Sequence, residues 1–85
     1  MAKTFEEVLG EVNGIFREVL NNAAIQLQRE TTAAEVPEWE SLTHVELVVA
    51  IEKHFGLRFN FVELQKFKNV GEWCDNIVGK LAQRG

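Results

Sequence analysis

The stretch WESLTHVEL, residues 39–47, holds two side chains that could carry chemistry, Ser41 and His44. A serine three residues before a histidine could act as a nucleophile if the imidazole removed its proton. The sequence has no Gly-x-Ser-x-Gly elbow and no accompanying oxyanion loop, so a hydrolase is disfavoured. Ser41 also opens a helical pattern, where serine is a preferred N-cap. The free N–H groups of a helix start would equally stabilise a phosphate esterified to this hydroxyl. The residues alone favour the ordinary N-cap, although the geometry of a helix start does not separate the two interpretations.

Cys74 is the single cysteine, and it lies on the apolar face of the last predicted helix, as a small core residue would. It excludes an internal disulfide and a zinc cluster, which suits a reducing compartment. A net charge of −4 gives no basic face for nucleic acid. No apolar run approaches the roughly 18 residues that span a bilayer, and no signal segment opens the chain. We expect a cytoplasmic monomer that binds neither nucleic acid nor membrane.

Helical periodicity indicates the elements that must position these side chains. The length of 85 residues predicts one small domain, 1–85. Apolar side chains recurring at i, i+3 and i+4 predict three main helices, over residues 4–20, 41–55 and 70–82. Thr4 with Glu7 forms a capping-box signature at the first start, and Asn69 with Glu72 repeats it at the last. Gly56 is placed to end the middle helix as a left-handed cap.

A short helix and a long connection complete the prediction. Residues 59–67 fit one or two helical turns capped by Asn60, with three apolar side chains pointing inward: Phe61, Leu64 and Phe67. Residues 21–40 are interpreted as a loop, because Asn21-Asn22, Thr31-Thr32 and Pro37 do not favour a helix. We expect four side chains to pin this loop: Ile25, Leu27, Val36 and Trp39. The predicted fold class is an all-α four-helix bundle.

The helix over residues 41–55 has two apolar stripes. On a helical wheel, one stripe suits a core: Leu47, Val48, Ile51 and Phe55. A second stripe consists of Leu42, Val45 and Val49, and Glu52 lies between the two. Because a chain this small cannot easily bury both stripes, the second either enters the core or faces a partner.

The sequence TTAAEVPEWESLTHVELVVAIEKHFG, residues 31–56, resembles the acyl carrier proteins. In that family an Asp-Ser-Leu motif opens the second helix, followed by a Val-Glu-Leu step and a Glu-rich stretch that ends in Phe. The matching residues here are Glu40-Ser41-Leu42, Val45-Glu46-Leu47 and Glu52 to Phe55. The helix order, the long first connection and the short third helix also agree with the family fold.

The resemblance implies a carrier that catalyses no reaction itself. Ser41 would bear 4′-phosphopantetheine, whose terminal thiol holds acyl intermediates as thioesters. The expected partners are a phosphopantetheinyl transferase and acyl-loading, synthase and acyl-transfer enzymes. They would dock on the second helix through six residues: Glu40, Leu42, Val45, Glu46, Val49 and Glu52. The alternative is a helical adaptor with the same fold that is never modified.

The motif departs from the family pattern at two places. Glu40 stands where the family usually has Asp, so its carboxylate lies one methylene further out. Lys53 and His54 replace acidic residues that are common in fatty-acid synthesis carriers. The end of the docking helix is therefore less acidic, which favours a dedicated set of partners in a specialised pathway, related to fatty-acid, polyketide or other metabolism.

Overall fold

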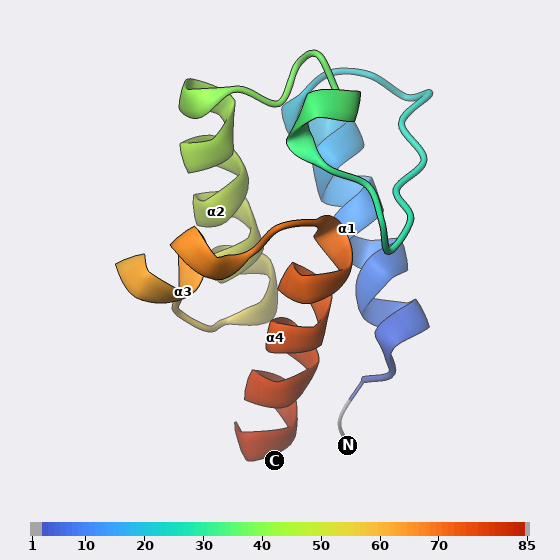
Figure 1. The fold of residues 1–85 in the computed structure, drawn as a ribbon. Helices are drawn as coiled ribbons and strands as arrows, with labels where there is room; N and C mark the ends of the chain where they lie inside the picture. Colours follow the sequence, from blue (N-terminus) through green and yellow to red (C-terminus); the bar gives the residue numbers. More distant parts are fainter. Residues whose placement is uncertain (1–2, 85) are drawn as a thin grey trace.

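A computed structural model describes residues 3–84, which form four α-helices and one turn of 3-10 helix (Figure 1). The elements are α1 (Phe5–Val19), η1 (Ala33–Glu35), α2 (Ser41–Phe55), α3 (Phe61–Lys66) and α4 (Val70–Arg84). No strand occurs between residues 3 and 84. The predicted all-α fold, with three main helices, a short third helix and a long loop before α2, is confirmed.

The helix ends follow the local signals of the sequence. At the start of α1, the Glu7 N–H donates to Thr4 Oγ1 at 3.2 Å, and the Thr4 N–H donates to Glu7 Oε1 at 2.9 Å. This is the predicted capping box, which satisfies two N–H groups that a helix start leaves unpaired. Gly56 ends α2 with a φ of 66°, the left-handed conformation that glycine adopts without steric cost.

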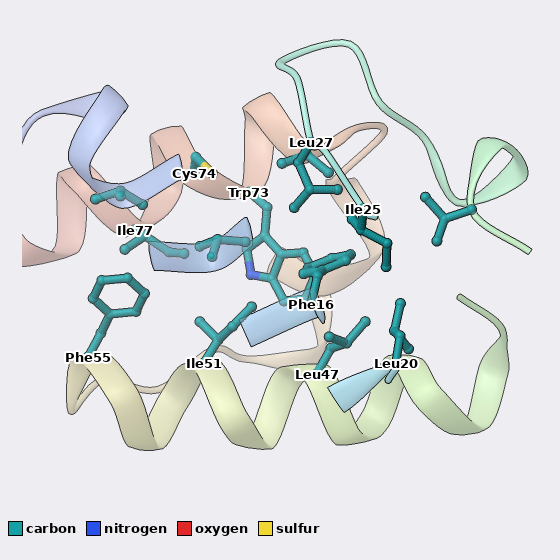
Figure 2. Packing of buried hydrophobic residues seen from close by; sticks show 14 of the residues in the cluster. Phe16, Leu20, Ile25, Leu27, Leu47, Ile51, Phe55, Trp73, Cys74 and Ile77 are labelled. Carbon is teal, nitrogen blue, oxygen red and sulfur yellow. The ribbon is translucent and has the colours of Figure 1, made fainter. Parts of the chain in front are cut away.

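The core forms where α1 packs against both α2 and α4. One stripe of α2 points into it, as predicted: Leu47, Ile51 and Phe55 (Figure 2). At its centre the Phe16 ring meets Trp73 edge to face, with 6.2 Å between the ring centroids. Cys74 is fully buried in this core, and its burial raises the pKa of the thiol to about 12. The cysteine is therefore a core residue and not a reactive thiol.

The loop over residues 21–40 is fixed to α1 by a buried side chain. Ile25, Leu27 and Val36 are buried as predicted, and Trp39 is half-buried. The amide of Asn13 donates to the Ile25 carbonyl at 3.1 Å and accepts a hydrogen bond from the Leu27 N–H. Arg17 Nε also donates to the Ile25 carbonyl, at 2.7 Å. These bonds satisfy backbone groups that would otherwise be buried without partners.

The same loop also contacts the start of α4. The N–H groups of Val70 and Gly71 donate to the carbonyls of Thr31 and Arg29, at 2.9 and 2.8 Å. The loop lies so close that a Cβ on Gly71 would come within 2.7 Å of the Arg29 carbonyl oxygen. Arg29 itself forms an ion pair with Asp75, at 2.8 Å. Two long helices therefore hold the loop that leads into α2.

The orientation of α3 corrects one prediction. Phe61 is 73% exposed and does not point inward, whereas Leu64 and Phe67 are half-buried. The cause is Glu63, which faces α4. Residues two positions apart in a helix, such as Phe61 and Glu63, are separated by about 200° around its axis. Phe61 therefore points away from α4.

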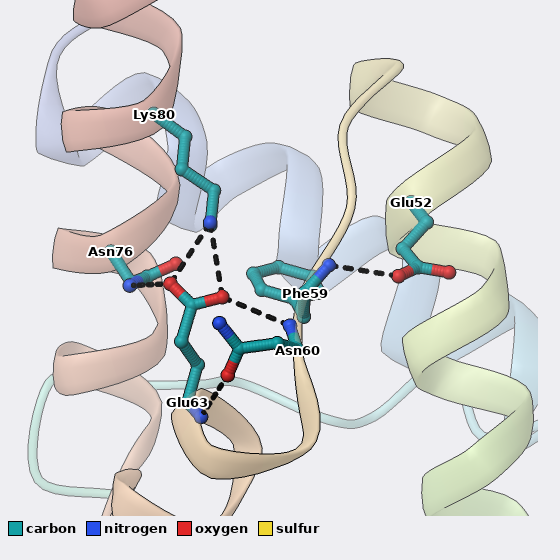
Figure 3. Close-up of polar contacts among 6 residues, drawn as sticks. All are labelled: Glu52, Phe59, Asn60, Glu63, Asn76 and Lys80. Atoms are coloured by element: carbon teal, nitrogen blue, oxygen red, sulfur yellow. Dashed lines mark hydrogen bonds and ion pairs between the residues drawn. The ribbon is translucent and has the colours of Figure 1, made fainter.

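A polar cluster holds α3 against α4 (Figure 3). The Glu63 carboxylate accepts hydrogen bonds from the Asn60 N–H at 3.0 Å and the Asn76 amide at 3.2 Å. It also pairs with the Lys80 ammonium at 2.9 Å. These contacts, the Asn60 N–H foremost, lower the pKa of Glu63 to about 2. The short helix is thus attached by one charged side chain as well as by apolar packing.

Candidate functional site

Ser41 is the first residue of α2, and its side chain is exposed. The residue before it, Glu40, has the extended conformation of an N-cap. Thr43 supplies the side-chain bond at this helix start, because its hydroxyl accepts from the Glu40 N–H at 2.8 Å and donates to the Glu38 carbonyl at 2.6 Å. Within residues 3–84, no hydrogen bond involves the Ser41 hydroxyl. The interpretation of Ser41 as an ordinary N-cap is therefore wrong.

The start of α2 is positively polarised around this hydroxyl. The helical hydrogen bonds begin with the His44 N–H, which donates to the Glu40 carbonyl at 2.7 Å. The N–H groups of Ser41 and Leu42 have no partner within the helix, and the first turn carries no acidic side chain. Unpaired N–H groups and the aligned peptide dipoles favour an anion at this position. A phosphate ester on Ser41 fits these surroundings.

His44 is half-buried and held against the loop. The indole N–H of Trp39 donates to His44 Nδ1 at 3.0 Å, and the two rings stack with an interplanar angle of 15°. Because an indole nitrogen can only donate, Nδ1 is the acceptor and the ring hydrogen lies on Nε2. Burial lowers the pKa of His44, which favours this neutral form. Its acceptor nitrogen is thus occupied and cannot remove the proton of Ser41.

A cavity of about 450 Å³ opens beside Ser41. Its walls come from the end of the loop, the start of α2, the link between α3 and α4, and α4 itself: Trp39, Ser41, His44, Phe67, Lys68 and Trp73. Several of its aromatic rings are nearly parallel, with interplanar angles of 21° between Phe67 and Trp73 and 28° between Trp39 and Trp73. Lys68 and Phe67 lie far from Ser41 along the chain, so no local sequence pattern connects them with this site.

The second apolar stripe of α2 is outside the core. Leu42, Val45 and Val49 are 70%, 59% and 42% exposed. Glu40 and Glu46 are exposed as well, and neither forms an ion pair within the described part of the chain. The structure therefore brings five of the six predicted docking residues to the surface of α2, where they could meet an apolar and basic partner.

Glu52 differs from the other five predicted docking residues. It is half-buried, and its carboxylate accepts a hydrogen bond from the Phe59 N–H at 2.9 Å (Figure 3). One of its oxygens is therefore used to fix the link between α2 and α3. His54, which stands near the end of α2 where the family has an acidic residue, also has a partner: its Nε2 lies 2.7 Å from Glu11 Oε1.

Comparisons with known proteins agree with this arrangement. Residues 4–77 match the family model described as a phosphopantetheine attachment site. The chain is 35% identical over 78 residues to an acyl carrier protein of Acidothermus cellulolyticus, covering 92% of this chain and 93% of the relative. It is 32% identical over 78 residues to the acyl carrier protein of Cyanidium caldarium, covering 92% and 91%. The chain belongs to the acyl carrier protein family.

A solved relative supports the family assignment at the level of the fold. The solution structure of a holo acyl carrier protein from Geobacter metallireducens superposes with a TM-score of 0.86. The two sequences are 42% identical, and the alignment covers 91% of this chain and 88% of the other. The 85-residue chain described here therefore has the acyl carrier protein fold and depends on covalently attached phosphopantetheine. Its role is that of a carrier.

Proposed function

We propose that Ser41 is the residue that bears the phosphopantetheine of this carrier. The observation that supports the proposal best is an exposed hydroxyl, free of hydrogen bonds within residues 3–84, at the positively polarised start of α2. In the modification, Ser41 Oγ forms a bond to a phosphorus of coenzyme A and its proton leaves. The pyrophosphate bond breaks, and adenosine bisphosphate is the leaving group. The bound group supplies a thiol that holds acyl intermediates as thioesters.

This chain's residues would then present the modified serine to enzymes. We place the docking surface on α2, formed by Leu42, Val45 and Val49 with the carboxylates of Glu40 and Glu46 beside them. Exposed charges speed the encounter with a basic partner, and a small apolar stripe keeps binding weak enough for release. Glu52 would contribute its carboxylate at the far end of this surface while it holds the Phe59 N–H.

The partners of this surface are a phosphopantetheinyl transferase and the enzymes that load, extend and transfer the acyl group. The less acidic end of α2, with Lys53 and His54, supports a specialised pathway rather than primary fatty-acid synthesis.

The carrier unit is a single domain, 1–85, and its monomeric state and cytoplasmic location stay predictions. No helix within the described residues has the length and apolar character that crossing a membrane requires.

An intact mass measurement tests the proposal. The chain is coexpressed with a broad-range phosphopantetheinyl transferase, and its mass should rise by one phosphopantetheine group. Ser41→Ala should keep the unmodified mass, whereas Thr43→Ser, which retains the capping hydroxyl, should still be modified. A wild-type mass that never rises would favour the unmodified helical adaptor.

A further inference from the structure

A second hollow, the distal hollow, lies at the end of α2 that is remote from Ser41. Its volume is about 370 Å³, and six residues line it: Val49, Glu52, Lys53, Gly56, Leu57 and Arg58. Val49 also belongs to the exposed apolar stripe of α2. The distal hollow is therefore continuous with the proposed docking surface, and a partner that lies along the stripe reaches it.

The exposed charge of the distal hollow is positive, although the chain as a whole has a net charge of −4. Lys53 and Arg58 are both exposed, and the side chain of neither forms an ion pair within residues 3–84. The Glu52 carboxylate is half-buried, and one of its oxygens accepts the Phe59 N–H at 2.9 Å (Figure 3). Two cationic side chains therefore remain available to a partner at this place.

The backbone around Arg58 is fixed against the end of α2. The Leu57 N–H donates to the Glu52 carbonyl at 3.1 Å, and the Phe59 N–H donates to the carboxylate of the same residue. A cation in the last turn of a helix complements the helix dipole, which accounts for Lys53 by itself. Arg58 lies beyond the helix end, where the dipole gives no such reason. A guanidinium on a fixed backbone is well suited to bind a carboxylate through two hydrogen bonds.

The docking surface changes sign along α2. Glu46 and Lys53 stand seven residues apart, so they face nearly the same direction and lie about 10 Å apart along the helix axis, with Val49 between them. This separation is about one Debye length at physiological ionic strength, roughly 8 Å. A partner therefore meets an acidic region, an apolar region and a basic region as distinct parts of one surface.

We propose that the distal hollow selects enzymes that place an acidic side chain against Lys53 and Arg58, with basic residues facing the serine end of α2. An enzyme whose docking face is basic throughout meets like charge at the distal hollow, which weakens its binding. This inference rests on the proposed modification of Ser41 and on the proposed docking surface. A second copy of the chain fits less well, because antiparallel pairing of two α2 helices would cover the serine end that enzymes must reach.

The first test uses the holo chain and an acyl-loading enzyme of primary fatty-acid synthesis, whose own carriers are acidic at the end of this helix. Intact mass first establishes that the prosthetic group is attached, so failure of the modification is recognised separately. The double variant Lys53→Glu/Arg58→Glu should raise kcat/KM for loading roughly tenfold above the wild type, and added salt should reduce the gain. Loading of the double variant no faster than the wild type overturns the inference.

Two further variants serve as controls for this measurement. Lys53→Glu alone should give part of the gain, whereas Lys66→Glu makes the same charge change at the exposed end of α3, outside the distal hollow, and should give none. An equal gain from these two variants would attribute the effect to net charge and overturn the inference. Glu46→Lys should slow loading in every background. If it does not, the docking surface on α2 is wrong, which is a separate failure.

A second test exchanges charges on the enzyme. Basic residues of its docking face are changed one at a time to glutamate, and each enzyme variant is paired with wild-type carrier and with Arg58→Glu. At the position that meets Arg58, the glutamate variant should load the wild type faster than Arg58→Glu, the reverse of the unchanged enzyme. No reversal at any position overturns the inference. Sedimentation equilibrium should give a monomer, and a dimer that Arg58→Glu dissociates would assign the distal hollow to a second copy instead.

Discussion

The indole N–H of Trp39 donates to Nδ1 of His44 across 3.0 Å, joining the end of the long loop to the first turn of α2. This bond holds the imidazole in its neutral form. Both residues line the cavity beside Ser41. It also makes the stability of the fold sensitive to the charge of a single histidine.

Stability should fall when the pH drops below the ordinary pKa of His44. Burial lowers this pKa from 6.5 in the folded state, so the unfolded chain binds a proton more readily. The contribution of neutral His44 is therefore complete above pH 6.5 and is lost as the pH falls toward the lowered value. Urea unfolding at pH 7.5 and 5.5 measures the loss. His44→Gln should reduce the difference in the free energy of unfolding between pH 7.5 and pH 5.5. An unchanged difference would contradict this account.

Gly71→Ala should destabilise the protein by about 1–3 kcal/mol, because the new Cβ overlaps a tightly packed neighbour. The Cβ would lie 2.7 Å from the Arg29 carbonyl oxygen, which belongs to the loop backbone and cannot rotate away. Gly79→Ala is the matched control in the same helix, since nothing lies within 4 Å of its Cβ position. It should stabilise the protein by roughly 0.5–1 kcal/mol. Chemical denaturation separates the two variants, and equal effects would refute the close contact.

Glu63→Gln should loosen α3 and lower the stability at pH 7 by about 1 kcal/mol, given a partly exposed ion pair with additional hydrogen bonds. The pKa of Glu63 falls from 4.5 to about 2 on folding, so its contribution is complete above pH 4.5. It is lost as the pH falls through about 2, and the variant and the wild type should converge there. Amide exchange in α3 measures the loosening. Glu6→Gln, on the exposed face of α1, should leave exchange in α3 unchanged.

Charge reversal on α2 should impair modification without unfolding the chain. Glu46→Lys should reduce kcat/KM of the transferase roughly tenfold, equivalent to about 1.4 kcal/mol of transition-state stabilisation. Glu18→Lys makes the same change on the exposed surface of α1 and should have little effect. Circular dichroism verifies that both variants remain helical. Similar rates for the two variants would remove α2 as the docking surface.

The elements that the sequence predicted well depend on neighbouring residues. The capping box of Thr4 and Glu7 spans three residues, and the left-handed Gly56 bonds the Glu52 carbonyl four residues before it; the structure contains both. The two stripes of α2 follow from helical spacing alone, but that spacing left the burial of the second stripe open. The structure buries the first stripe and exposes the second. The family motif indicated Ser41, because its residues are contiguous along the chain.

What the sequence did not predict depends on contacts between distant residues. Asn13 is buried because it binds Ile25 and Leu27 across the loop, and no local pattern announces that pairing. The exposure of Phe61 follows from the attraction of Glu63 to α4, which overrides apolar spacing in a helix of six residues. The N-cap interpretation of Ser41 was wrong because a second hydroxyl residue, Thr43, stands two positions later. The hydroxyl of Thr43 makes the side-chain hydrogen bonds at the start of α2.

The position of Thr43 has a consequence for the life cycle of the carrier. The bonds that start α2 belong to a hydroxyl two residues after the one that we propose to be esterified. Adding or removing the prosthetic group would therefore break none of the bonds that hold the helix. The start of α2 therefore has the same hydrogen bonds before the arm is attached and after it is removed.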